Sequence, residues 1–308
     1  MRKITPHLWF DNNAVEATQF YTTLFPGSEI TNISTIRDTP SGDCDIVSFK
    51  LWGQPFMAIS AGPFFELNPS VSFMVNFDPL FFGPGADAKT VAQAKLEAVW
   101  ERLAEGGKVL MPLDQYPFSE RYGWIQDKYG VSWQLILTDP AGDKRPAIIP
   151  SLMFTGGNAG RAEEAIDFYV AVFNDGKRGE THRYGPGQQP DIEGSLTYAD
   201  FRIEGAWFAA MDSRQELNFG FNEAVSFIVN CDTQEEIDYY WSKLSAEPAA
   251  EQCGWLKDRF GLSWQVNPSR MDEMLKDPDP ERVKRVTQAF LGMKKFDIAQ
   301  LEKAFAGV

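Results

Sequence analysis

The chain contains the same ordered series of motifs twice, and this internal repeat limits the folds that it can adopt. The segment from Gly123 to Gln134 returns as Gly254 to Gln265, with the same spacing of glycine, aspartate and tryptophan. Three shorter matches precede it in the same order: residues 6–10 with 150–154, 17–21 with 165–169, and 71–78 with 225–232. Four ordered matches indicate a tandem duplication, so the two halves should share one fold.

The composition is that of a folded protein with an acidic surface. With 308 residues, of which 44% are hydrophobic, the chain can bury a core in each of two domain-sized halves. A net charge of −14 repels the phosphate backbone, so we expect no nucleic-acid partner. No apolar leader or membrane-spanning run is present, which favours a cytoplasmic protein without a membrane partner. The three cysteines occupy non-equivalent positions and are expected to be reduced.

The hydrophobic periodicity predicts a strand, a helix and three strands, and then the same order again. Residues 4–10 alternate as a strand, and residues 12–25 follow at helical spacing before Pro26-Gly27. Gly53-Gln54 is a two-residue turn of the kind that joins hairpin strands, and residues 88–104 form an amphipathic helix. The second half repeats this plan from Ile149 to Gln265. The whole chain is therefore predicted to be an α+β protein of four βαβββ modules.

The repeat also predicts where the domains begin and end. We expect a first domain at 1–138, a polar linker at 139–147, a second domain at 148–270 and a helical extension at 271–308. In the extension, Asp279-Pro280 and Asp297 are expected to start two helices. The sequence leaves open whether modules pair within a half or between halves. In one arrangement His7 faces Gln134, and in the other it faces Gln265.

The paired modules and several longer motifs resemble a known superfamily. The motifs are residues 4–11, 17–21, 53–56, 253–265 and 293–298. They are similar to the PhnB-like branch, called 3-demethylubiquinone-9 3-methyltransferase-like, of the vicinal oxygen chelate (glyoxalase/bleomycin resistance/dioxygenase) superfamily. The resemblance implies two glyoxalase-like halves and a fused pseudo-dimer, which could be monomeric. Methyl transfer is not supported, because no Gly-rich loop with a following acidic ribose-binding residue is present.

The resemblance also implies where a metal would bind, on the first and last strands of the modules. The matching residues are His7, Gln134 and Gln265. The match is incomplete, since His7 becomes Ser151 in the second half and a neutral amide is a weak ligand for a divalent ion. We therefore expect no cofactor, with a divalent metal as the alternative. Period two places Trp9 on the face of His7, and each glutamine could instead join neighbouring strands.

The sharpest difference between the halves is a segment present only in the first. Leu103 and Trp124 are 21 positions apart, whereas Leu244 and Trp255 are 11 apart. The ten extra residues belong to a segment that includes Phe118, Glu120, Arg121 and Tyr122. It could close a small-molecule pocket, with Glu120 as general acid or base and Arg121 as anchor for an anion, or be a surface hairpin.

Three functional hypotheses follow. The preferred one is a protein that binds a small apolar or aromatic molecule in a sheet-lined cup without a metal. Ligand contacts are then expected from His7, Trp9, Phe64, Phe118, Arg121, Gln134 and Gln265. The second is an enzyme, either a metal-dependent glyoxalase or dioxygenase type or a metal-free catalyst using Glu120 and Tyr122. The third treats the second half as a structural partner of the first.

Overall fold

The computed structural model describes residues 2–139 and 144–308 and divides the chain into two compact units. Unit 1 comprises residues 1–22, 29–66 and 221–308, and unit 2 comprises residues 23–28 and 67–220. Each unit contains one mixed sheet, of seven strands in unit 1 and eight in unit 2. The predicted α+β class is confirmed.

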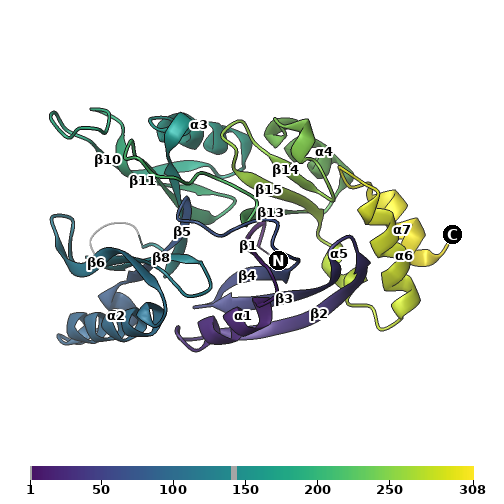
Figure 1. The fold of residues 1–308 in the computed structure, drawn as a ribbon, viewed down its shortest axis with the longest axis horizontal. Helices are drawn as coiled ribbons and strands as arrows, with labels where there is room; N and C mark the ends of the chain where they lie inside the picture. Colours follow the sequence, from purple (N-terminus) through teal and green to yellow (C-terminus); the bar gives the residue numbers. More distant parts are fainter. Residues whose placement is uncertain (1, 140–143) are drawn as a thin grey trace. The chain divides into compact units, whose positions relative to one another are not determined.

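Unit 1 combines the first module of the first repeat with the second module of the second repeat (Figure 1). The first of these modules consists of β1 (Ile4–Phe10), α1 (Ala14–Thr22), β2 (Glu29–Thr39), β3 (Gly42–Leu51) and β4 (Gln54–Ser60). The second consists of β13 (Val225–Cys231), α4 (Gln234–Leu244), the 3₁₀ turn η3 (Pro248–Ala250), β14 (Trp255–Lys257) and β15 (Ser263–Pro268). Strands β1 and β13 pair antiparallel at the centre, in the order β14-β15-β13-β1-β4-β3-β2.

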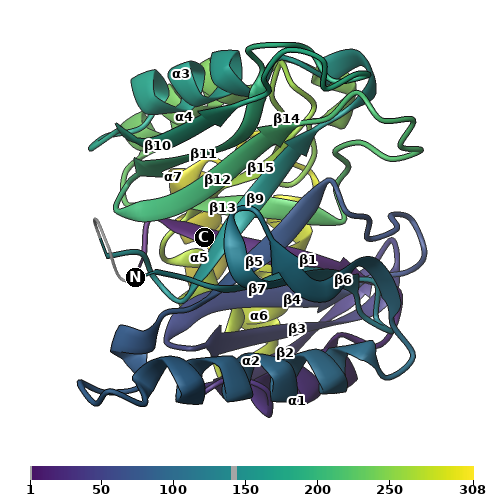
Figure 2. The same cartoon turned by 90° about the vertical axis from the view of Figure 1, so that its left-hand side faces the viewer.

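Unit 2 combines the two remaining modules in the same way. The first consists of β5 (Val71–Phe77), η1 (Pro79–Phe81), α2 (Ala88–Ala104), β6 (Lys108–Tyr116), β7 (Ser119–Gln126) and β8 (Ser132–Leu137). The second consists of β9 (Ile148–Phe154), η2 (Gly156–Asn158), α3 (Ala162–Val172), β10 (Lys177–Arg183), β11 (Leu196–Ile203) and β12 (Ala206–Asp212). Strands β5 and β9 pair antiparallel at the centre, and α3 lies over β10, β11 and β12 (Figure 2).

Modules therefore pair between repeats, which answers the question that the sequence left open. The compact units do not coincide with the predicted boundaries 1–138 and 148–270, which remain a prediction about the repeat units of the sequence. Of the predicted linker 139–147, residues 140–143 lie outside the described residues. Its end is tied to β5, because Asn76 donates its backbone N–H to Ala147 and its side-chain amide to Pro146.

A buried aspartate explains the pattern that the longest matching segments of the two repeats share. These segments are Gly123 to Gln134 and Gly254 to Gln265. Asp127 accepts the backbone N–H of Tyr129 and Val131 with one oxygen and the indole N–H of Trp133, at 2.8 Å, with the other. Asp258 makes the same three bonds in the second repeat. The bonds fix the turn before the last strand and hold the tryptophan in the core.

Replacing this aspartate by asparagine should be costly, because an amide group cannot accept all three bonds in the same geometry. We expect Asp258→Asn to lower the free energy of unfolding by about 3 kcal/mol, as for buried charge-assisted hydrogen bonds. Urea unfolding followed by circular dichroism measures it. The control is Asp238→Asn, which breaks an exposed ion pair with Lys295, keeps an amide oxygen that can still accept from Gln234, and should cost at most about 1 kcal/mol. Equal losses in the two variants would contradict this account.

The fourth module departs from the predicted βαβββ order, because only two strands follow α4. The missing strand is the counterpart of β6, and the ten residues that the second repeat lacks account for it. Consequently β14 is an edge strand of its sheet. The edge is covered by the C-terminal extension, since Cys253 and Gly254 donate their N–H groups to the carbonyls of Met293 and Lys294.

The extension itself forms the helices that the sequence predicts. It consists of α5 (Met271–Leu275), α6 (Pro280–Leu291) and α7 (Ile298–Ala306). Asp279 and Asp297 cap α6 and α7 by accepting backbone N–H groups, as expected. Phe296, just before α7, is buried against Gly254, where a Cβ would lie 2.4 Å from its ring.

Phe296 should therefore hold the extension on the sheet. We expect Phe296→Ala to lower the free energy of unfolding by about 3 kcal/mol through loss of apolar burial and the cavity left behind. The control is Lys294→Ala in the same segment, whose side chain is exposed and should cost less than about 1 kcal/mol. Thermal unfolding of both variants tests this, and an unchanged melting temperature for Phe296→Ala would rule it out.

Candidate functional site

The candidate site in unit 1 lies on the sheet face opposite α1 and α4, here called the His7 face. Side chains alternate along β1, so that Leu8 and Phe10 enter the core while His7 and Trp9 point to the other face. Neighbouring strands add Ser226 of β13, Gln265 of β15 and Trp255 of β14. The register places His7 opposite Ser226, and Gln265 opposite Trp255.

His7 is buried in surroundings that keep it neutral. Its side chain is 4% exposed, and its ring meets the ring of Trp255 edge-on at a centroid distance of 5.4 Å. Burial lowers the pKa of the imidazole from its usual value to about 3, so the ring carries no charge near pH 7. Among the described residues, the His7 Nδ1 atom has no hydrogen-bond partner. An unpaired buried polar atom costs about 1–3 kcal/mol, and a functional role is one explanation for such an atom.

Four aromatic rings form a wall beside His7. Trp9 meets Trp255 at 6.0 Å, Phe65 at 5.0 Å and Phe64 at 6.5 Å between ring centroids. The indole N–H of Trp9 donates to the Gly62 carbonyl at 2.8 Å, which fixes that ring. Phe64 is 65% exposed, so the wall reaches the surface. The wall therefore offers apolar, flat contact area beside a neutral imidazole.

The two repeated glutamines join neighbouring strands in both units. Gln265 donates from Nε2 to Ser226 Oγ at 2.9 Å, and Gln134 donates to Ser72 Oγ at 2.6 Å. Gln134 also accepts the phenol proton of Tyr122, at 2.8 Å between oxygens. Burial raises the pKa of Tyr122, which therefore remains a neutral hydrogen-bond donor.

The corresponding face of unit 2 is filled by its own side chains. Trp207 and Tyr198 pack against Met74 and Ile149. At the end of the linker, Arg145 lies 3.8 Å from the centre of the Trp207 ring. Its guanidinium also pairs with the buried Asp200, at 2.6 Å. When Ser151 of unit 2 is matched with His7 of unit 1, the strand pairing also matches the neighbouring residues of the two units. Trp207, Tyr198 and Asp200 of unit 2 then occupy the positions of the smaller Pro55, Ile46 and Ser48 of unit 1.

The segment present only in the first repeat is a β-hairpin, formed by β6 and β7. Glu120 pairs with Lys89 at 2.7 Å, and Arg121 pairs with Glu97 at 3.0 Å. Phe118, at the turn, is 62% exposed. The structure gives Glu120 and Tyr122 different partners and so does not place them as an acid–base pair.

The residues present do not fit a divalent metal. Within residues 2–139 and 144–308, no group of three or more His, Cys, Asp or Glu side chains is arranged to hold one. His7 lies among rings, and the Glu223 carboxylate near β14 is already paired with Lys257 at 2.9 Å. In unit 2, Ser151 occupies the position of His7, and Gln134 is within 3.5 Å of it. Neutral hydroxyl and amide groups are weak ligands for such ions.

Sequence reasoning missed parts of both faces. It used Trp255 only to compare the spacing of the halves, whereas this ring contacts both His7 and Trp9. It also missed Ser226, although the repeated Val-Ser-Phe segments mark Ser72 and Ser226 as equivalent. Arg145 lies in the expected linker, and no local pattern shows that it pairs with Asp200.

Paired modules of this type define the glyoxalase-like, or vicinal oxygen chelate, class of α+β proteins. The model of one family in this class, 3-demethylubiquinone-9 3-methyltransferase, matches residues 2–136 and 146–267. The chain therefore belongs to that family. The two matched segments are the two sequence repeats, which confirms the resemblance.

Solved structures provide further likenesses. The PhnB protein of Bacillus cereus is 38% identical, over 44% of this chain and 99% of that one, with a TM-score of 0.37. A Staphylococcus aureus protein is 32% identical, over 44% and 97%, with a TM-score of 0.17. Glyoxalase I of Zea mays is 13% identical, over 86% and 93%, with a TM-score of 0.49. No curated protein has a sequence that matches this chain. None of the described helices is long and apolar enough to cross a membrane.

The buried imidazole predicts a pH dependence of stability. Because the pKa of His7 is lowered to about 3, the unfolded chain binds more protons than the folded one below pH 6.5. Stability should therefore fall as the pH drops from 6.5 towards 3, and His7 contributes about 1.4 kcal/mol per pH unit to this fall. Urea unfolding between pH 7.5 and 4.5 should show that the free energy of unfolding falls less for His7→Gln than for the native protein.

His182 supplies the matched control, since it is the other histidine of the chain and its side chain is 65% exposed. His182→Gln should keep the native pH dependence. If His7→Gln and the native protein lost stability in parallel, the imidazole would not be the buried neutral group described above.

Proposed function

We propose that this protein binds a small apolar or aromatic molecule on the His7 face of unit 1, without a metal. The observation that carries the proposal is the wall of aromatic rings beside a buried neutral imidazole with an unpaired nitrogen. Such sites combine apolar contact area with a few polar groups that fix the orientation of the ligand.

The aromatic wall supports an apolar ligand. Trp9 and Trp255 offer ring edges and faces at the sheet, and Phe64 and Phe65 extend the apolar surface towards solvent. A flat ring can stack on them or meet them edge-on, as aromatic pairs do in protein interiors. Lys257 of β14 pairs with Glu223 at 2.9 Å, and both side chains are about four-fifths buried, so this pair leaves the aromatic wall apolar.

His7 supports a ligand that carries one hydrogen-bonding group. Its neutral imidazole can donate from one nitrogen or accept at the other. A ligand hydroxyl would pair with Nδ1 when the surrounding rings separate to admit it, which would remove the cost of leaving this atom unpaired. The amide of Gln265 supports β15 beside this position through its bond to Ser226.

Unit 2 supports the same choice by contrast. Its equivalent face carries Ser151 in place of His7, and Trp207, Tyr198 and the Arg145–Asp200 pair occupy the space that smaller residues line in unit 1. We therefore assign ligand binding to unit 1 and a structural role to this face of unit 2.

The test uses 2-naphthol and naphthalene as probes, with tryptophan fluorescence as the readout. We expect both to bind the native protein, with 2-naphthol several-fold tighter because of its hydroxyl. Phe64→Ala should weaken the binding of both probes about tenfold, because one well-placed aromatic contact is lost. His7→Phe should remove the advantage of 2-naphthol while naphthalene still binds.

The matched control is Phe118→Ala, which removes an equally exposed phenylalanine from the hairpin of unit 2. It should leave the affinity for both probes unchanged. Binding that survives Phe64→Ala and His7→Phe in full, or that falls equally with Phe118→Ala, would refute the assignment to the His7 face.

A further inference from the structure

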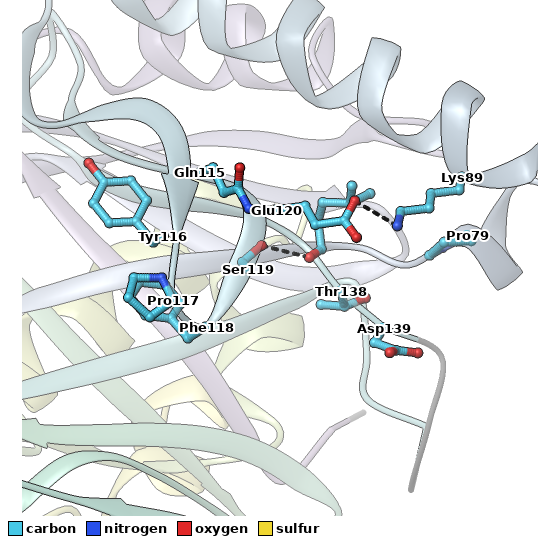
Figure 3. Close-up of a pocket in the computed structure, with 11 residues that line it drawn as sticks. Pro79, Lys89, Gln115, Tyr116, Pro117, Phe118, Ser119, Glu120, Thr138 and Asp139 are labelled. Carbon is cyan, nitrogen blue, oxygen red and sulfur yellow. Dashed lines mark hydrogen bonds and ion pairs between the residues drawn. The ribbon is translucent and has the colours of Figure 1, made fainter.

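A separate pocket lies in unit 2, at the turn of the β6–β7 hairpin (Figure 3). Its volume is about 380 Å³, close to the lower end of the range for small-molecule sites. The hairpin forms one side, and the start of α2 and the residues after β8 form the others. The residues that the argument uses are Lys89, Tyr116, Phe118, Glu120, Thr138 and Asp139.

One wall of the pocket is aromatic and well supported. The rings of Tyr116 and Phe118 stack at 5.6 Å between centroids, with 20° between their planes. Both meet the ring of Tyr122 edge-on, at 5.6 Å and 5.0 Å. Tyr122 is buried and bonded to Gln134, so the sheet holds the stacked pair in place from behind. Phe118 nevertheless remains largely exposed, which leaves its ring accessible to a ligand.

The opposite wall is polar and carries a negative balance. Glu120 and Lys89 pair at 2.7 Å, so their charges compensate each other (Figure 3). Asp139 adds a further carboxylate, and the pocket lining therefore has a net charge of −1. An anionic ligand would meet two carboxylates and a lysine that is already paired. Thr138 also lines the pocket, and its Oγ1 atom is buried without a hydrogen-bond partner.

The pocket belongs to the segment that distinguishes the repeats. In the second repeat, the described chain passes from α4 through η3 to β14 with no counterpart of β6. Tyr116 and Phe118 thus have no equivalents there, whereas Glu120 corresponds to Glu251 when the repeats are counted back from Trp124 and Trp255. Removal of the ten residues would remove the aromatic wall.

We propose that this pocket is a second binding site, distinct from the His7 face, and that it takes a small planar organic cation. The aromatic faces of Tyr116 and Phe118 attract a positive charge placed over them. Glu120 and Asp139 add long-range attraction that salt will screen. A single fused ring system matches the size of the pocket.

Titration calorimetry at low ionic strength with N-methylquinolinium tests the proposal. Naphthalene and 2-naphthoate serve as the neutral and anionic probes of the same shape. Because naphthalene is also expected to bind the His7 face, the affinity of this pocket for each probe is taken from the binding that Phe118→Ala removes. We expect the cation to bind at least about tenfold tighter than either, with the advantage falling as salt is added. Phe118→Ala should weaken the binding of the cation about tenfold. Glu120→Gln brings the lining to a net charge of zero and should weaken the binding of the cation several-fold.

The matched control is Phe64→Ala in unit 1, which should leave cation binding unchanged. Equal affinity for the cation and the neutral probe, or cation binding that neither Phe118→Ala nor Glu120→Gln reduces, would overturn the proposal. Because the two phenylalanine variants act on different probes, failure here and failure of the proposed function of the His7 face are distinguishable.

Discussion

The antiparallel pairing of module-opening strands from different repeats is the interaction on which the rest of the structure depends. Strand β1 pairs with β13 in unit 1, and β5 pairs with β9 in unit 2. This pairing joins two modules into one sheet, and it decides which side chains share a face. It places His7 with Gln265 and Trp255, while Gln134 is placed with Ser151. Either sheet would lose its centre without the partner repeat.

Much of the fold could be predicted from the sequence because it depends on local patterns. Period two correctly placed His7 and Trp9 on one face, where both rings meet Trp255. The choice of partner module could not be predicted, because both arrangements satisfy the same local patterns. The β6–β7 hairpin was also predicted only in part, since Pro112 and Pro117 interrupt its alternation. The bonds of Cys253 and Gly254 to Met293 and Lys294 join distant parts of the chain, so no local pattern reveals them.

The two sheet faces show how a duplicated framework can diverge. The aspartate that fixes the last turn, the tryptophan that it holds and the glutamine that joins two strands occur in both repeats with the same contacts. Around this shared framework, unit 1 keeps half-buried residues such as Met57 and Ile59 on the His7 face. Unit 2 places Trp207 and an arginine–aspartate pair there instead. The framework therefore tolerates either a wall of aromatic rings around a histidine or an arginine–aspartate pair packed with a tryptophan.

In the sequence, most of unit 2 lies between two segments of unit 1, and this order affects folding during synthesis. Unit 2 is built almost entirely from residues 67–220, whereas unit 1 needs both ends of the sequence, since Ile4 pairs with Val229. At ordinary rates of synthesis, the first strand leaves the ribosome roughly 10–40 s before its partner exists. The inner unit can finish folding during that interval, while the apolar edge of β1 has no partner strand. A chaperone that shields nascent chains would act on this N-terminal module for longer than on any other part of the protein.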